Sequence, residues 1–243
     1  MSESLALTRL LNQVFGGVIV TVMHALGLSA DPATVIDDAL ALELLVGAGL
    51  ILFFVLVRLT LSVDKPNVLQ QMAEMIHEFT GEQGEQIIGH GYERFQAFAT
   101  CIGLFVLINN LLGLIPGLVS PTSKPVVPLG IAILTFLYYN FHGVRAQGPI
   151  GYLKHFAGPL WWLSPLLFPI EVVSHCARVM ALTIRLYANM LAGDLVTLVF
   201  FSLIPVAVPA IFLGMHFFVS LIQAYVFMLL SMIYLSEAVS HEH

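Results

Sequence analysis

The sequence predicts an all-α polytopic membrane protein with five spanning helices, one amphipathic surface helix and a long, strongly tilted C-terminal helix hairpin. Hydrophobic residues make up 58% of the 243 residues and charged residues only 10%, whereas a soluble domain carries about 25% charged residues. The mean hydropathy is +0.93. Several apolar stretches reach the ~20 residues that a helix needs to cross a bilayer. We therefore interpret the chain as a single membrane domain.

The first part of the chain divides into an N-terminal segment, three spans and one surface helix. Residues 1–38 lack a convincing signal-peptide pattern and favour a short amphipathic or re-entrant helix. Residues 39–63 form the first predicted span, and residues 95–119 and 125–144 form the second and third. Residues 66–92 place apolar side chains at helical spacing among four glutamates. That pattern is typical of an amphipathic helix at the membrane surface or of a mount for a partner protein.

The last third of the chain consists of two unusually long helices. They are predicted at residues 165–204 and 210–237, and Pro205 and Pro209 interrupt the helical pattern between them. The first is about twice as long as the ~20 residues of a perpendicular span. Two helices of this length in a hairpin must tilt strongly in the membrane or project from it.

Polar side chains follow one face of each hairpin helix. In the first helix they recur at spacings that keep them on one face, and they are Glu171, His175, Arg178, Arg185 and Asn189, with Asp194 beyond them. The second helix carries a sparser row, consisting of His216, Ser220, Gln223 and Ser231. Ser220 and Ser231 fit a purely structural role in holding helices together. A structural ion pair between Glu171 and Arg178 is equally open.

Arg185 fits a structural role least well. A charged side chain at the centre of a bilayer costs at least ~2.5–3.5 kcal/mol, and no acidic residue lies three or four positions from Arg185. Its partner must therefore come from another helix or another chain. Arginine keeps its proton at any relevant pH, whereas aspartate, glutamate and histidine can load and release protons. The pattern predicts two proton paths separated by a fixed cation.

The stretch RLYANMLAGDL, residues 185–195, closely resembles the signature of subunit a of the F-type ATP synthases, the stator channel subunit of their membrane sector. The resemblance extends to FPIEVVSHCARVMALTIRL, to INNLLGLIPG at the end of the second span and to the C-terminal stretch that begins HFFVSLIQAYVFMLL. It covers the chain from the first span onward.

The resemblance implies a role for the residues around the arginine. The essential arginine of the family falls on Arg185 and faces the proton-carrying carboxylate of a rotating ring of c subunits. The family's asparagine one turn later falls on Asn189. The glutamine on the last helix, opposite the arginine, falls on Gln223.

The resemblance also implies two half-channels. The titratable pair of the inlet path falls on Asp194 and His216, with Asn110 beside them at the end of the second span. Many bacterial members carry glutamate at the position of Asp194, and mitochondrial members carry histidine. Glu171 falls toward the outlet, and we hypothesise that His175 joins it because histidine titrates near neutral pH. Arg178 is assigned a structural or auxiliary role.

The implied partners are the c-subunit ring, the b-subunit peripheral stalk, the other ATP synthase subunits, the lipid bilayer and the transported proton. No basic run indicates nucleic acid, no phosphate-binding glycine loop is present, and no cofactor or metal is expected. The implied role is a non-catalytic one. Lysine and arginine in short loops divide five to two, which favours an outside N-terminus and a cytoplasmic C-terminus. The expected location is a bacterial plasma membrane, with a plastid membrane as the alternative.

Two other classes of protein stay open from the residues alone. A self-contained secondary transporter or channel could line a substrate site with the same polar rows, but the sequence shows no internal repeat of the kind such transporters have. A structural membrane scaffold accounts for the acidic helix at 66–92 but not for Arg185. Copurification with a ring of small proteolipids would separate the three readings.

Overall fold

The computed structural model describes residues 6–25, 36–63, 65–115, 118, 120–148, 151–152, 164–203 and 207–239. These residues contain helices and turns and no strand. The elements are α1 (Ala6–Ala25), α2 (Asp38–Leu59), α3 (Val68–Ile88), α4 (Glu93–Leu112), the short 3-10 helix η1 (Pro121–Ser123), α5 (Val126–Gln147), α7 (Ser164–Leu203) and α8 (Ala207–Val239). Helices α2, α4, α5, α7 and α8 are long and apolar enough to cross a membrane. The predicted all-α polytopic membrane fold is confirmed.

Helix α4 is shorter than the range 95–119 suggested. It ends at Leu112, and Gly113 caps it with a backbone N–H that bonds the carbonyls of Asn110 and Leu111. The chain then turns through η1 before α5 begins. Part of this connection, and the hairpin turn at Pro205, lie outside the described residues.

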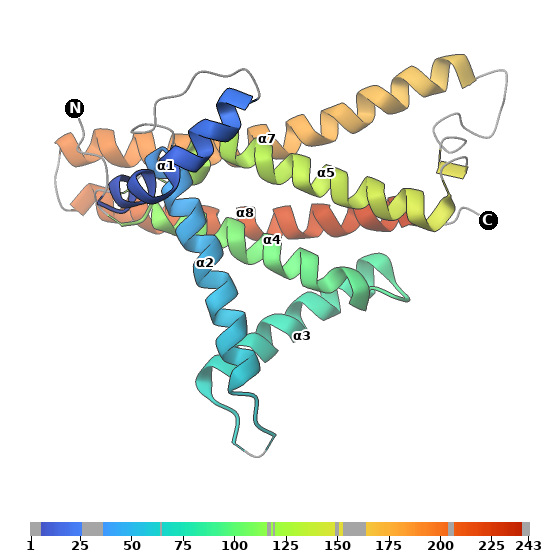
Figure 1. The fold of residues 1–243 in the computed structure, drawn as a ribbon, viewed down its shortest axis with the longest axis horizontal. Helices are drawn as coiled ribbons and strands as arrows, with labels where there is room; N and C mark the ends of the chain where they lie inside the picture. The colour runs from blue at the N-terminus through green and yellow to red at the C-terminus, as the bar shows by residue number, and fades with distance from the viewer. Residues whose placement is uncertain are drawn as a thin grey trace.

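The hairpin dominates the shape of the molecule. Helix α7 has 40 residues and α8 has 33, which correspond to about 60 Å and 50 Å at 1.5 Å per residue. In Figure 1, α5, α7 and α8 run along the long axis of the molecule, while α2 crosses this direction steeply. Helix α2 and the hairpin therefore cannot both stand perpendicular to one bilayer, whose hydrocarbon core is ~30 Å thick. This arrangement agrees with the predicted strong tilt of the hairpin.

The main hydrophobic core lies where α4, α5, α7 and α8 meet. Helix α7 contributes Leu182, Leu186 and Met190, which recur every four residues and are buried. Successive residues of a helix point about 100° apart, so burial of these three side chains leaves the residues next to them on the outer side of α7. The packing of the core therefore fixes which face of α7 remains uncovered.

Helix α3 packs on α4 through polar contacts. The Oγ1 atom of Thr100 donates a hydrogen bond of 3.0 Å to Oγ1 of Thr80, and the Gln96 amide donates to the backbone carbonyl of His77. Three apolar side chains of α3 are instead exposed, namely Val68, Met72 and Met75, whereas the ring of Phe79 lies 5.8 Å from that of Tyr225 on α8. Helix α3 is amphipathic as predicted, and its apolar face is open to a membrane surface or a partner. In Figure 1 it diverges from α2 at the base of the molecule.

Candidate functional site

Arg185 lies on the uncovered face of α7. Its side chain is exposed, while Leu186, the next residue, is buried in the core. Asn189, one turn further along α7, is also exposed. Among the residues that the structure describes, the guanidinium of Arg185 makes no hydrogen bond and no salt bridge. The prediction that its partner lies outside its own helix agrees with this geometry.

A pair of titratable side chains joins α7 to α8. The Oδ1 atom of Asp194 lies 3.9 Å from Nδ1 of His216, and His216 is buried. Two glycines make room for the pair. A Cβ atom on Gly193 would lie 2.5 Å from Nδ1 of His216, and one on Gly113 would lie 3.1 Å from Oδ1 of Asp194. Glycine is required at Gly193 because the side chain of His216 occupies that space.

Hydroxyl groups of η1 connect this pair to α4. Thr122 donates a hydrogen bond of 2.6 Å to Oδ1 of Asn110, and its hydroxyl lies 2.7 Å from that of Ser120. A Cβ atom on Gly113 would meet both Cβ of Ser120, at 2.9 Å, and Oδ1 of Asp194, at 3.1 Å, so Asp194 lies beside this turn. The same Cβ atom would lie 3.4 Å from the backbone oxygen of Asn110, so Asn110 and Asp194 lie close together. Sequence reasoning missed the three hydroxyl residues of this turn, although they follow closely on the span that contains Asn110.

Several buried polar atoms around this cluster have no hydrogen-bond partner among the described residues. They are Oδ1 of Asn109, Nδ2 of Asn110, Oδ2 of Asp194, Oγ1 of Thr197 and Nε2 of His216. Buried polar groups are paired in the great majority of cases, and each exception calls for a reason. A path that carries water or protons between α4, α7 and α8 would explain these unpaired atoms, since such a path needs polar groups with spare hydrogen-bonding capacity.

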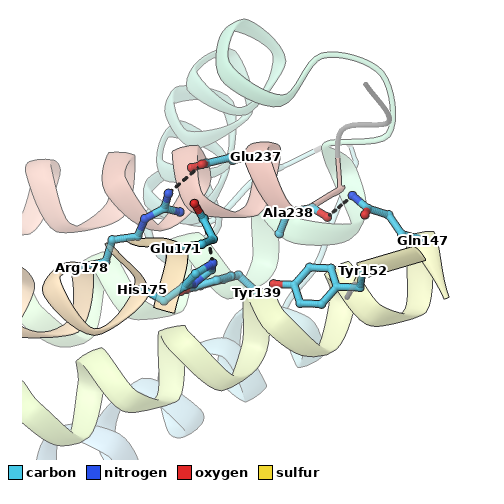
Figure 2. Close-up of a pocket in the computed structure, with 8 residues that line it drawn as sticks. All are labelled: Tyr139, Gln147, Tyr152, Glu171, His175, Arg178, Glu237 and Ala238. Atoms are coloured by element: carbon cyan, nitrogen blue, oxygen red, sulfur yellow. Dashed lines mark hydrogen bonds and ion pairs between the residues drawn. The ribbon is translucent and has the colours of Figure 1, made fainter. Parts of the chain in front are cut away.

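A second polar cluster lies near the N-terminal end of α7 and lines a small pocket (Figure 2). Nε2 of His175 is 3.3 Å from Oε1 of Glu171, and Nδ1 of His175 is 2.8 Å from the hydroxyl of Tyr139. Nη2 of Arg178 donates a hydrogen bond of 2.7 Å to Oε1 of Glu237 on α8. The salt bridge of Arg178 is therefore made to α8 and not to Glu171, contrary to the structural pairing that the spacing left open.

One further contact helps to fix the position of Arg178. Its guanidinium carbon lies 5.2 Å from the centre of the Tyr234 ring, a distance at which a cation is attracted to the ring face. Nearby, Gln147 donates a hydrogen bond of 3.2 Å to the carbonyl of Ala238. These contacts join the ends of α5, α7 and α8. Sequence reasoning missed Tyr139 and Glu237, because contacts between distant helices leave no periodic signal.

Arg185 lies along α7 between the two clusters. It is 14 residues from Glu171 and 9 from Asp194, or about 21 Å and 14 Å along the helix axis. Gln223 is buried on α8, and within the described part of the chain no hydrogen bond joins it to Arg185. The serines of the second polar row bond carbonyls of their own helix, as Ser220 does with His216. The arrangement offers two separate sets of titratable groups with a fixed cation between them.

Gly193→Ala is expected to reduce proton transport severalfold. The new Cβ atom would approach His216 to 2.5 Å, so the imidazole must leave its place beside Asp194 or the two hairpin helices must separate. Overpacking of this kind costs about 1–3 kcal/mol. The measurement is proton pumping in membrane vesicles at matched amounts of assembled protein. Gly214→Ala is the control, since a Cβ there meets nothing within 4 Å. Equal pumping by both variants would show that the fit between Gly193 and His216 is unimportant.

Five candidate spans and titratable groups buried between helices define a polytopic membrane protein built to move an ion. The family model of the ATP synthase A chain matches residues 40–236. The chain is 52% identical over 244 residues to ATP synthase subunit a of Koribacter versatilis, with both chains covered completely. It is 50% identical to that of Solibacter usitatus, over 83% of this chain and 87% of the relative. The corresponding protein of Bdellovibrio bacteriovorus is 43% identical, over 72% and 76% of the two chains.

The chain therefore belongs to the ATP synthase A chain family. It is a membrane-sector subunit with the role of a proton-translocating stator. This membership agrees with the resemblance seen in residues 185–195, and it argues against the self-contained transporter and the scaffold.

Proposed function

We propose that this chain supplies two offset proton half-channels and the fixed cation that couple proton flow to rotation of a c-subunit ring. It takes no part in the chemistry of ATP, which other subunits carry out. The observation that carries the proposal is Arg185, an exposed cation on an apolar helix with no acidic partner among the described residues. A carboxylate on a neighbouring chain is the partner that such a cation requires.

The physical chemistry of the ring carboxylate explains why an arginine is needed. A neutral carboxylic acid can enter the lipid at far lower cost than its anion. A nearby guanidinium favours the ionised form of a carboxylate, so a ring subunit that reaches Arg185 gives up its proton. Because arginine does not release its own proton, protons cannot pass it directly from one half-channel to the other. Proton flow then requires the ring to turn.

The outer half-channel follows the cluster between α4, η1 and the hairpin. Protons arrive by way of Asn110, Asp194 and His216, with Gln223 deeper in the hairpin and Asn189 beside the arginine. The inner half-channel follows Glu171 and His175, and Arg178 has an auxiliary role there because Glu237 neutralises it. Each proton that crosses gains ~2.3 kcal/mol per 100 mV of membrane potential, so one ATP needs several crossings.

The remaining partners and the orientation follow from the same family role. The chain works within an ATP synthase complex, and its contacts are the c-subunit ring, the b-subunit peripheral stalk and the bilayer. The N-terminus lies outside and the C-terminus in the cytoplasm, as the lysine and arginine distribution favours. A bacterial plasma membrane is the location, which is supported by the bacterial relatives.

Cysteine cross-linking tests whether the Arg185 face of α7 meets the ring. Ala181 and Ala192 are exposed on that face, four residues before and seven after Arg185. After the native Cys101 and Cys176, which are both exposed, are changed to serine, Ala181→Cys or Ala192→Cys is combined with a cysteine beside the ring carboxylate. Oxidation is expected to give a product that contains both subunits.

The matched control is Leu186→Cys, next to the arginine but buried in the core. It is expected to give no product with the ring under the same conditions. The proposal fails if the exposed positions remain unlinked while the membrane sector is intact, or if the buried position links equally well.

A further inference from the structure

A phenol, an imidazole and a carboxylate form a continuous chain in the second polar cluster. Tyr139 on α5 is 2% exposed and His175 on α7 is 8% exposed. The Tyr139 hydroxyl lies 2.8 Å from Nδ1 of His175, and Nε2 of the same ring lies 3.3 Å from Oε1 of Glu171. Figure 2 shows the three side chains in this order, with the imidazole between the other two. Nothing in the resemblance to subunit a assigns a role to Tyr139.

The hydroxyl of Tyr139 can serve both protonation states of His175. When the imidazole is neutral and Glu171 is ionised, the carboxylate can only accept a hydrogen bond, so the ring proton sits on Nε2 and the phenol O–H donates to Nδ1. When the imidazole is protonated, Nδ1–H donates to the phenol oxygen and Nε2–H still faces the carboxylate. A hydroxyl that both donates and accepts thus keeps the ring in one orientation while its charge changes.

We infer that Tyr139 is a positioning residue of the inner half-channel, which holds His175 so that Nε2 carries a proton toward Glu171 and stabilises the imidazolium as an intermediate proton carrier. The inference rests on the proposed role of Glu171 and His175 in that half-channel. In the step concerned, a proton from the aqueous side reaches the Glu171 carboxylate or the His175 imidazole and is later released toward the ring. No bond other than those to the proton forms or breaks.

Charged and titratable groups from three helices surround His175. Glu171 and Arg178 come from its own helix, Tyr139 comes from α5, and Glu237 and Tyr234 come from α8. Tyr152, which follows α5, lines the same pocket. The charge of Arg178 is offset by Glu237. Glu171 and Tyr139 lie within reach of the two ring nitrogens, and of these two groups Tyr139 is the one that can change from donor to acceptor.

Tyr139→Phe is expected to make the imidazolium of His175 harder to form. The variant keeps the ring and removes only the hydroxyl. Hydrogen bonds to an ionised group are about twice as strong as neutral ones. Removal of the hydroxyl therefore costs the protonated imidazole more stabilisation than it costs the neutral one. Proton uptake from the inner face then requires a lower pH. A mere packing role for Tyr139 predicts no such change in pH dependence.

The test is ATP-driven pumping in inverted vesicles, in which the bath meets the cytoplasmic face. The rate of proton pumping is divided by the rate of ATP hydrolysis at each pH, so that the pH dependence of the catalytic sector cancels. We expect the midpoint of the high-pH decline to move to lower pH in Tyr139→Phe, by about half a pH unit or more. Thr135→Val is the control, since Thr135 is a buried hydroxyl on the same helix that bonds the carbonyl of Ile131. Its profile is expected to match the wild type.

Comparisons with further variants make the outcomes decisive. If His175→Asn shifts the profile and Tyr139→Phe does not, the inference for Tyr139 is overturned while the inner half-channel stands. If neither His175→Asn nor Glu171→Gln changes the profile, the proposed inner half-channel itself is wrong. Tyr139→Phe in a His175→Asn background is expected to add nothing, and an added shift would overturn the inference. Should Tyr139→Phe fail to assemble, 4-fluorophenylalanine at position 139 fills the space of the hydroxyl with a weak acceptor that cannot donate, and the same direction of shift is expected.

Discussion

In inverted membrane vesicles, Arg185→Ala is expected to abolish ATP-driven proton pumping. The ring carboxylate that reaches α7 would then have no fixed cation to hold it ionised. Leaving a desolvated charge without its partner costs about 3–5 kcal/mol, and a barrier raised by that amount slows the step by about 100-fold or more. Assembly is expected to survive, since Arg185 is exposed and contributes nothing to the core of the chain. The measurement is the pH gradient formed after ATP is added.

Arg178→Ala is the control for the loss of a positive charge on the same helix. Arg178 already has a partner in Glu237, and its position is near the pocket of the second cluster. We expect a much smaller loss of pumping from this variant. Equal losses from the two variants would mean that α7 needs positive charge in general and that Arg185 has no special place.

Asp194→Asn is expected to stop both pumping and passive proton flow. Asparagine keeps nearly the same shape but does not titrate, so the outer path loses its carboxyl while the contact with His216 changes little in geometry. A positioned proton-transfer group contributes typically about 10²–10⁴-fold to the rate of the step it serves. The difference from Arg185→Ala lies in passive flow, which the asparagine variant is expected to lose. The measurement is the rate of proton flux into vesicles under an imposed potential.

Ser220→Ala is the matched control for Asp194→Asn. Ser220 is buried one turn from His216, and its hydroxyl bonds a carbonyl of its own helix. Its removal is expected to leave proton flux near the wild-type level. Normal flux in Asp194→Asn would show that protons reach the ring by another route.

The fold could be predicted almost entirely from composition and helical periodicity. The length of each apolar run identifies the five candidate spans directly, because in lipid only a helix satisfies the hydrogen bonding of every backbone group within a single segment. The amphipathic character of α3 follows from the spacing of its apolar side chains among glutamates. The end of α4 at Leu112 is harder to predict, because the apolar run continues beyond the helix through Gly113 into the turn.

The site could be predicted where its functional residues can be recognised within a single helix. Arg185 is recognisable because burying its charge in a membrane is costly and no acidic residue lies within helical reach of it. The resemblance adds Asp194 and His216, and in the structure Oδ1 of Asp194 lies 3.9 Å from Nδ1 of His216. The contacts made by Ser120, Thr122 and Tyr139 could not be predicted in this way. They depend on which helices lie side by side, and periodicity describes each helix only by itself.

The most direct measurement is passive proton conductance of vesicles from which the ATP-hydrolysing sector has been removed, compared between wild type, Arg185→Ala and Asp194→Asn. If Arg185 separates the two half-channels, conductance persists or rises in Arg185→Ala although coupled pumping is lost, and it falls in Asp194→Asn. Conductance that falls in Arg185→Ala as far as in Asp194→Asn would contradict a gate at Arg185. Coupled pumping at the wild-type rate in Arg185→Ala would contradict it as well, and Arg185 would then be a structural counter-ion.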